Sequence, residues 1–215
     1  MSTNLLDDLQ KAIVTYAAED ASMLATRIVK EGIDPLRALD TMTLAIRQVG
    51  DGFNKGKLWL PDLIRASEAF QAALPKLMEE LRRSGKERKS SGLVVIGTVF
   101  GDIHNIGKDM VATLLMADGF VVHDLGVNVT AERFIEAVRE HRADLLAMSA
   151  LLSISAPEQK KVIADLKNTG LRNTARVMVG GGAITQEFAD SIGADGYAAT
   201  APLATALART LLNQR

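Results

Sequence analysis

The chain has 215 residues, of which 47% are hydrophobic and 24% are charged, and its net charge at pH 7 is −1. This is the composition of an ordinary globular protein, and the near-neutral charge gives no reason to expect a nucleic acid partner. The absence of cysteine excludes disulfides, thiolate catalysis and cysteine-bound zinc, so any metal must be held by histidine or carboxylate. Without a leader pattern or an apolar run of about 20 residues, we expect a soluble cytoplasmic protein with no membrane partner.

Residues 1–83 are predicted to form a small helical bundle. Their apolar side chains recur at helical spacing, and almost none show the strict alternation of a strand. Gly50, Gly52 and Gly56 are expected to break the third helix before a last helix begins, and Pro75 is a possible site of a kink in that last helix. The pattern therefore predicts a bundle of four or five short helices.

Residues 84–91 are predicted to be a linker. They lie in a polar, basic run that extends from Arg82 to Gly92 and contains no large apolar side chain. Its lysines and arginines could suggest a patch for nucleic acid, but no aromatic residues are interleaved with them. We interpret the run as a solvated connection between two domains.

Residues 92–215 alternate between short apolar runs and amphipathic segments, as five successive βα units do. The expected strands are 93–99, 120–125, 145–149, 177–179 and 196–198, and the expected helices are 105–117, 130–141, 157–169, 185–192 and 202–213. This pattern predicts an α/β fold in which a five-stranded parallel sheet, Rossmann-like and flavodoxin-like, carries helices on both faces. Ligands bind such sheets at the carboxyl ends of the strands.

Three polar or glycine-rich segments follow strands and should meet at that edge. They are Gly101–Gly107, Ser149–Ser155 and Gly180–Gly182. Within the first, Asp102 and His104 are two residues apart, so both side chains can serve one site. Glycines on either side leave room for a bulky ligand.

Nucleotides fit this segment poorly. Gly101 and Gly107-Lys108 resemble a P-loop, but five residues separate the glycines where that motif has four, and Asp109 stands in place of the Ser or Thr that ligates magnesium. The glycines before this segment also lack the spacing of a dinucleotide-binding turn. Asp124, at the end of the second strand, is too common a feature to rescue that interpretation.

Metal binding is a better possibility, and the chain has three histidines. Asp102 and His104 could supply two ligands to zinc. His141 lies at the end of a predicted helix, where a cation is mildly favourable, and His123 is either an ordinary strand residue or part of the rim of the site. Alternatively, His104 could form one axial bond to the metal of a macrocycle while Asp102 holds its other ring nitrogen.

The three segments also carry a family resemblance. Asp102-x-His104-x-x-Gly107, Ser149-x-Leu151 and Gly180-Gly181 occur in this order, and together they resemble the signature of cobalamin-binding domains. The first half, with Gly52-Phe53, Gly56-Lys57 and Leu60-Pro61, is similar to the helical cap of corrinoid proteins from methyltransferase systems. The resemblance covers nearly the whole chain and includes carriers for methylamines, methanol and methoxy-aromatic compounds.

The resemblance implies a cobalamin or a related corrinoid whose own base is detached and replaced under cobalt by His104. Asp102 would be the hydrogen-bond partner of that histidine, and Ser155 would continue the relay. Ser153-Ile154-Ser155 stands where the family often has threonines, so the hydroxyls are retained. The residues expected to contact the cofactor are Gly101, Asp102, Ile103, His104, Asn105, Ile106, Gly107, Ser149, Leu151, Ser153, Gly180, Gly181 and Gly182.

The function that the resemblance implies is methyl transport. Such a protein accepts a methyl group on cobalt from a substrate-specific methyltransferase and yields it to a second methyltransferase with a folate, pterin or thiol acceptor. A reductive activator of Co(II) would be a further partner, and the chain alone would perform only half-reactions. The side chains expected to cover the upper face of the cofactor are Phe53, Leu58, Trp59, Leu60 and Leu63, although such a cluster is also typical of a plain bundle core.

Three alternatives stay open at this point. The same two domains could form a cobalamin-dependent sensor that regulates transcription, although no DNA-reading helix is evident. The second domain could be the cobalamin subunit of a carbon-skeleton mutase, a class that normally lacks such a bundle. It could also be a flavodoxin-like domain for a metal or a nucleotide.

Overall fold

A computed structural model describes residues 2–85 and 90–213. The chain divides into two compact units, Met1–Lys89 and Ser90–Arg215. Residues 86–89 of the predicted linker lie outside the described residues, whereas Ser84 still belongs to a helix that Gly85 caps with a φ of 64°. No helix in the described ranges has the length and apolar character needed to span a membrane.

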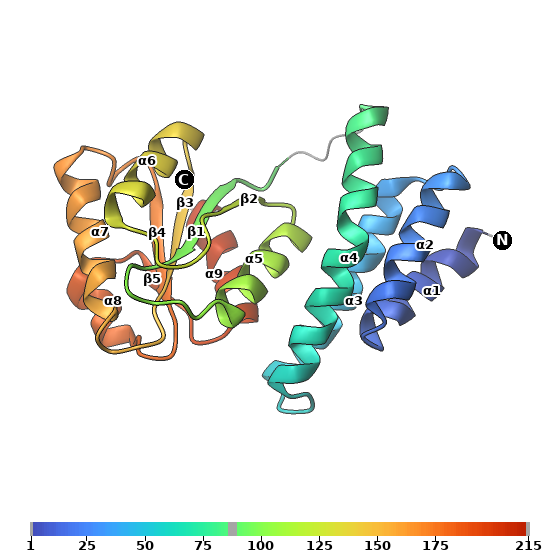
Figure 1. Cartoon of the computed structure of the whole chain (residues 1–215), viewed down its shortest axis with the longest axis horizontal. Coiled ribbons are helices and arrows are strands. Elements are labelled where there is room, and N and C mark those ends of the chain that lie inside the picture. Colours follow the sequence, from blue (N-terminus) through green and yellow to red (C-terminus); the bar gives the residue numbers. More distant parts are fainter. Residues whose placement is uncertain (1, 86–89, 214–215) are drawn as a thin grey trace. The chain divides into compact units, whose positions relative to one another are not determined.

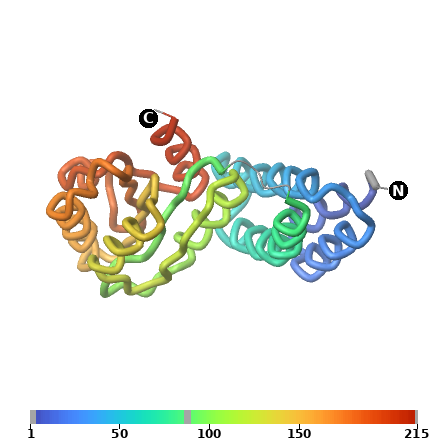
Figure 2. Tube along the Cα trace, turned by 90° about the horizontal axis from the view of Figure 1, so that it is seen from above, coloured from blue at the N-terminus to red at the C-terminus, as the bar shows by residue number. Residues whose placement is uncertain are grey.

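The first unit is a bundle of four helices in its described part. They are α1 (Ser2–Val14), α2 (Ala18–Lys30), α3 (Pro35–Asn54) and α4 (Leu60–Ser84), and Figures 1 and 2 show them packed together. Each helix turns an apolar face inward, and the fully buried side chains include Leu9, Ile28, Met42 and Phe70. The amphipathic spacing of the sequence therefore accounts for this unit.

One of these helices is longer than the sequence predicted. Helix α3 continues through Gly50 and Gly52 to Asn54, whereas α4 is the predicted last helix and has Pro75 inside it. A glycine costs a helix only about 1 kcal/mol, which the buried face of α3 outweighs. At Gly52 a side chain would be out of place, since a Cβ atom there would lie 2.7 Å from Cδ1 of Leu58. The expectation of short helices broken at these glycines is wrong.

The side chains expected to cover a cofactor differ in exposure. Leu63 is completely buried, as a side chain of the bundle core is. Trp59 is 76% exposed and Leu60 is 46% exposed, so these two do not belong to the bundle core. Trp59 lies at the N-cap of α4, where its backbone N–H donates to Oδ2 of Asp62 at 2.7 Å.

The second unit is a parallel sheet flanked by helices. Its strands are β1 (Leu93–Thr98), β2 (Val121–Asp124), β3 (Leu145–Ser149), β4 (Arg176–Gly180) and β5 (Gly196–Tyr197), in the order β2-β1-β3-β4-β5. Its helices are α5 (Ile106–Ala117), α6 (Ala131–His141), α7 (Ala156–Asn168), α8 (Gln186–Ile192) and α9 (Ala201–Asn213). Every predicted boundary in this unit agrees within one residue, and the predicted fold class is confirmed.

Helices α6, α7 and α8 cover one face of the sheet, and α5 and α9 cover the other (Figure 1). Side chains alternate between the two faces along each strand, so Thr98, Ser149 and Gly180 lie on the α5/α9 face, as do the preceding core residues Ile96 and Ala147. Thr98 pairs with Ser149, and Ser149 pairs with Gly180. The carboxyl ends of three adjacent strands therefore meet at one edge.

Candidate functional site

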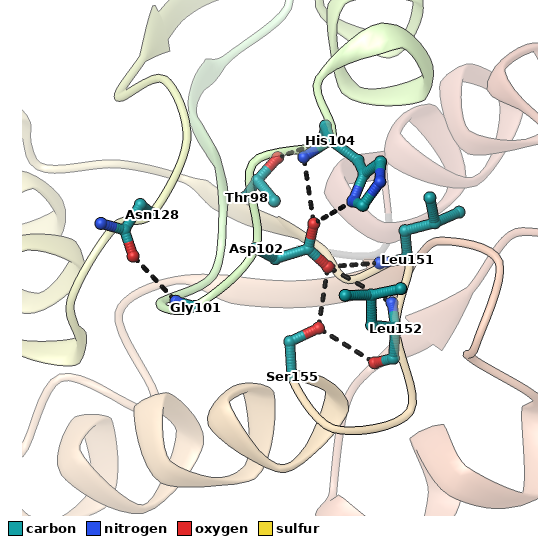
Figure 3. A network of polar contacts seen from close by, with 8 residues as sticks. All are labelled: Thr98, Gly101, Asp102, His104, Asn128, Leu151, Leu152 and Ser155. Atoms are coloured by element: carbon teal, nitrogen blue, oxygen red, sulfur yellow. Dashed lines mark hydrogen bonds and ion pairs between the residues drawn. The ribbon is translucent and has the colours of Figure 1, made fainter.

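The loop between β1 and α5 carries the central polar residues of the site. It turns sharply at Gly101, whose φ is 76°, and the Gly101 N–H donates to Oδ1 of Asn128 at 2.8 Å. The hydroxyl of Thr98 donates to the carbonyl oxygen of His104 at 3.0 Å (Figure 3). These bonds hold both ends of a loop that has no regular backbone pairing of its own.

Asp102 lies at the centre of this network and is 1% exposed. Its Oδ1 accepts from the His104 backbone N–H at 3.0 Å and lies 2.8 Å from Nδ1 of the His104 ring. Its Oδ2 accepts from the N–H groups of Leu151 at 2.8 Å and Leu152 at 3.3 Å, and from the hydroxyl of Ser155 at 2.8 Å. Figure 3 shows the carboxylate between the histidine on one side and the loop after β3 on the other.

The hydrogen bonds keep Asp102 ionised. Burial raises the pKa of a carboxyl group, but here the backbone N–H of His104, the Ser155 hydroxyl, the His104 ring and the Leu151 N–H together outweigh that effect. They hold the pKa of Asp102 well below its ordinary value. At neutral pH the site therefore contains a buried carboxylate with every oxygen engaged.

This carboxylate defines the state of His104. An ionised Asp102 accepts the proton on Nδ1, so Nε2 carries the lone pair, which is the arrangement found in metal-ligating histidines. The His104 side chain is 48% exposed, and Nε2 has no hydrogen bond within the described residues. No cluster of three or more His, Cys, Asp or Glu suited to a metal ion occurs in those residues. The geometry therefore suits a single axial bond better than a zinc site built from several side chains.

Exposed apolar side chains lie on the two loops that meet at Asp102 and His104. Phe100, Ile103 and Ile106 are exposed on the β1–α5 side, and Leu151 and Ile154 are exposed on the β3–α7 side. Ile106 is the first residue of α5 and is exposed there, although it carries an apolar side chain. A broad, flat ligand with apolar faces and a central metal, such as a corrin, fits this rim around an exposed imidazole.

The predicted glycines have distinct surroundings. A Cβ atom on Gly107 would meet nothing within 4 Å, so the space beside the start of α5 is open. A Cβ atom on Gly181 would lie 2.1 Å from the carbonyl oxygen of Ala150, and one on Gly182 would lie 2.7 Å from Cδ1 of Leu151. Glycine at these two positions thus lets the loops after β3 and β4 approach each other.

The other residues that the sequence predicted for the site make no hydrogen bond to Asp102 in the described part of the chain. Ser149 and Gly180 are neighbours on the α5/α9 face, whereas Ser153 is exposed and no hydrogen bond in the described residues joins it to Asp102. The amide of Asn105 does not reach Asp102 and instead donates to Oδ2 of Asp109 at 2.8 Å.

Sequence reasoning missed several members of the network. Thr98, Asn128 and the N–H of Leu152 were not predicted, because isolated polar residues at strand ends and in loops carry no periodic signal. Asn128 has a φ of 54°, a conformation in which asparagine is enriched. Its residue type therefore suits this turn but does not point to a contact with Gly101. His123 stacks on His141 and does not join the network around Asp102.

Comparison with known proteins identifies the class. A model described as a B12 binding domain matches residues 92–206, and a second model with the same description matches residues 5–77. The dimethylamine corrinoid protein 1 of Methanosarcina acetivorans is 40% identical over 209 residues, which are 97% of each chain. The trimethylamine corrinoid protein of Methanosarcina barkeri is 38% identical over 205 residues, covering 95% of this chain and 94% of that protein.

Solved structures agree. The methanol:cobalamin methyltransferase complex of Methanosarcina barkeri contains a chain that matches with a TM-score of 0.83 and 28% identity, covering 99% of this chain and 81% of that one. The monomethylamine corrinoid protein of the same organism matches with a TM-score of 0.55 and 30% identity, covering 98% and 100%. The chain therefore belongs to the family of B12-binding corrinoid proteins.

These relatives confirm the predicted resemblance to corrinoid proteins of methyltransferase systems, and they confirm a corrinoid as the cofactor. They give no support to a sensor, a mutase subunit or a nucleotide-binding domain. The roles of individual residues stay predictions, which the geometry above makes specific.

Proposed function

We propose that this chain is a corrinoid methyl carrier: it takes a methyl group from a substrate-specific methyltransferase and yields it to a second one. The similarity to methylamine corrinoid proteins and to a chain in a methanol:cobalamin methyltransferase complex supports the first partner. A bound corrinoid supplies the cobalt that takes up and releases the methyl group. An acceptor methyltransferase for a folate, pterin or thiol, and a reductive activator, complete the proposed set of partners.

The observation that carries the proposal is the state of His104. Its Nδ1 is 2.8 Å from a fully buried carboxylate, while its ring is half exposed among apolar side chains. An imidazole held in this way presents Nε2 as a neutral ligand of fixed orientation. We assign His104 as the lower axial ligand of cobalt.

Asp102 and Ser155 have supporting roles in this proposal. The low pKa of Asp102 keeps the shared proton on Nδ1 of His104 while the ring serves as a ligand. The hydroxyl of Ser155 donates to Oδ2 of Asp102 at 2.8 Å and so stabilises the ionised carboxylate. The same carboxylate would accept the Nδ1–H of His104 whether or not the ring held the metal.

The detached nucleotide tail of the corrinoid needs a slot in the protein. Ser149 and Gly180 are paired neighbours on the α5/α9 face, close to the loop that carries His104. We assign this edge of the sheet to the tail. The hydroxyl of Ser149 would be a polar contact, and Gly180, which has no side chain, would leave space beside the backbone. Leu151 adds apolar surface, and its backbone N–H is already committed to Asp102.

Spectroscopy of the reconstituted protein tests the ligand assignment. Protein with 15N-labelled histidine is loaded with cobalamin and reduced to Co(II). The electron paramagnetic resonance signal is examined for the splitting of a ligating histidine 15N, which differs from that of the 14N in the corrinoid's own base. We expect His104→Ala to bind the corrinoid but to lose the histidine splitting, whereas His141→Gln, which changes a histidine away from the network, keeps it. An unchanged signal in His104→Ala would refute axial ligation by this residue.

Assays with partners test the carrier function. The loaded, reduced protein is mixed with methylamine-specific or methanol-specific methyltransferases and the labelled substrate, and label on the corrinoid is measured. We expect transfer only when the matching methyltransferase is present, and release of the label only when an acceptor methyltransferase is added. Complete turnover by the purified chain without either partner would contradict the proposal.

A further inference from the structure

Lys108 is a buried cation that the proposed function leaves without a role. Its side chain is only 2% exposed, although lysine is almost never fully buried unless it is paired. It also lies in the first turn of α5, where the helix dipole disfavours a positive charge. Both the burial of this charge and its place at a helix N-terminus are unfavourable, so negatively charged groups must stabilise it.

The ammonium group of Lys108 joins two carboxylates from different elements. Nζ donates to Oδ1 of Asp109 at 2.5 Å, on the same helix, and to Oδ2 of Asp124, which ends β2. The other oxygen of Asp124 accepts from the Gly126 N–H at 2.8 Å, so this carboxylate is itself held in place. Lys108 therefore ties the start of α5 to the end of β2.

The same network reaches the residue that follows His104. The second oxygen of Asp109 accepts from the side-chain amide of Asn105 at 2.8 Å. A continuous path of polar contacts thus runs from Asp124 through Lys108 and Asp109 to Asn105. A lysine engaged in this way cannot serve a phosphate group, which agrees with the rejection of a P-loop.

The His104 loop is consequently fixed from two sides. Asp102 ties it to the loop after β3, through Leu151, Leu152 and Ser155. The Lys108 network ties the other side of the loop to β2. Together with the bond from the Thr98 hydroxyl to the His104 carbonyl oxygen and the backbone bonds of Asp102, these side-chain contacts position the imidazole of His104.

We propose that Lys108 is a positioning residue that fixes the place of His104 for axial ligation, an inference that rests on the proposed function. An axial bond requires the ring nitrogen to be held within a fraction of an ångström of one place. Removal of the ammonium group leaves Asp109 and Asp124 as neighbouring like charges, which repel each other. The first turn of α5 then moves away from β2, and Asn105 and His104 move with it.

The principal test compares Lys108→Met, which removes the ammonium group but keeps an unbranched side chain, with Lys161→Met, at an exposed lysine on α7. In the full chain loaded with cobalamin and reduced to Co(II), we expect the fraction with the histidine splitting to fall at least about threefold in Lys108→Met and to stay unchanged in Lys161→Met. Bound corrinoid is quantified in parallel. A full histidine signal in Lys108→Met would overturn the inference.

A hydrogen-exchange measurement and a second variant show whether a change in the histidine signal comes from movement of the His104 loop. Without cofactor, amide hydrogen exchange in residues 101–107 should be about tenfold faster in Lys108→Met, while exchange in β3 and β4 stays as in the parent chain. If Lys108→Met does not fold, Asp124→Asn removes one partner at the surface and should give a smaller change in the same direction. Absence of the histidine signal in the parent protein would instead refute the proposed function.

Discussion

The imidazole rings of His123 and His141 stack face to face, with their centroids 3.8 Å apart and their planes inclined by 10°. His123 belongs to β2, the edge strand, and His141 ends α6. Burial lowers the pKa of His123, the proximity of His141 lowers it further, and Glu140 opposes the shift. Two rings in this arrangement cannot both take up a proton without repulsion.

This pair predicts a loss of stability in mild acid. The folded pKa of His123 lies below the ordinary value of 6.5, so below that pH the unfolded chain binds more protons than the folded one. The contribution of the neutral ring is complete above about pH 6.5 and is lost as the pH falls toward the lowered folded pKa. Urea unfolding at several pH values between 5 and 8, followed through NMR signals of residues 90–213, measures the effect.

The matched variants are His123→Gln and His104→Ala. The first removes the titrating ring and should flatten the pH dependence of the free energy of unfolding in this range. The second removes a histidine outside the stack and should leave the His123 contribution in place. Equal pH dependence in His123→Gln and the parent chain would show that the stack does not control stability.

The two serines of the loop after β3 should differ sharply. Ser155→Ala removes a buried hydrogen bond to Oδ2 of Asp102 and should lower the free energy of unfolding by about 1–2 kcal/mol. Ser153→Ala changes an exposed side chain and should stay within about 0.5 kcal/mol of the parent. Chemical denaturation measures both, and equal effects of the two substitutions would contradict the place assigned to Ser155.

Substitutions at two glycines should have different effects, one on the stability of the second unit and the other on corrinoid binding. Gly181→Ala should destabilise the second unit by at least about 2 kcal/mol, because φ is 114° and the new Cβ atom would overlap the Ala150 backbone. Gly107→Ala meets no protein atom and should keep or slightly raise stability within α5. If the corrin occupies that space, Gly107→Ala weakens corrinoid binding about tenfold. Titration with cobalamin measures this affinity, and unchanged binding would remove Gly107 from the site.

The start of α4 offers a contrast within the bundle. Leu63→Ala should cost about 2–5 kcal/mol because the side chain is fully buried, whereas Leu60→Ala, at an exposed position, should cost less than about 1 kcal/mol. Urea unfolding followed through NMR signals of residues 2–85 measures both effects in the first unit. A large loss in Leu60→Ala would indicate that this side chain is covered in solution.

The second unit was predictable because its signals are local and agree with one another. Buried strands such as Leu93–Thr98 are continuous apolar runs, and each following helix is amphipathic, so the boundaries are placed within one residue. The bundle was harder to delimit. Packing kept α3 helical through Gly50 and Gly52, and no local pattern reveals that Leu58 fills the space beside Gly52.

The part of the site that could be predicted from the sequence consists of residues in the motif shared with the family. Asp102 and His104 are only two residues apart, and the resemblance to the family pointed to Ser155, which lies 53 residues from Asp102. The contacts of Lys108 and Asn128 depend on where β2 ends relative to β1, and sequence spacing does not encode that distance. Tertiary contacts between loops are therefore the part that required a structure.

The two oxygens of Asp102 belong to one rigid, planar group, yet one serves His104 and the other serves residues 151–155. The histidine and the loop after β3 consequently cannot shift independently without breaking a hydrogen bond in a buried place. Ile154 lies at the surface of that same loop. A protein that contacted Ile154 and moved this loop would have to break a hydrogen bond to Asp102 or move His104 as well.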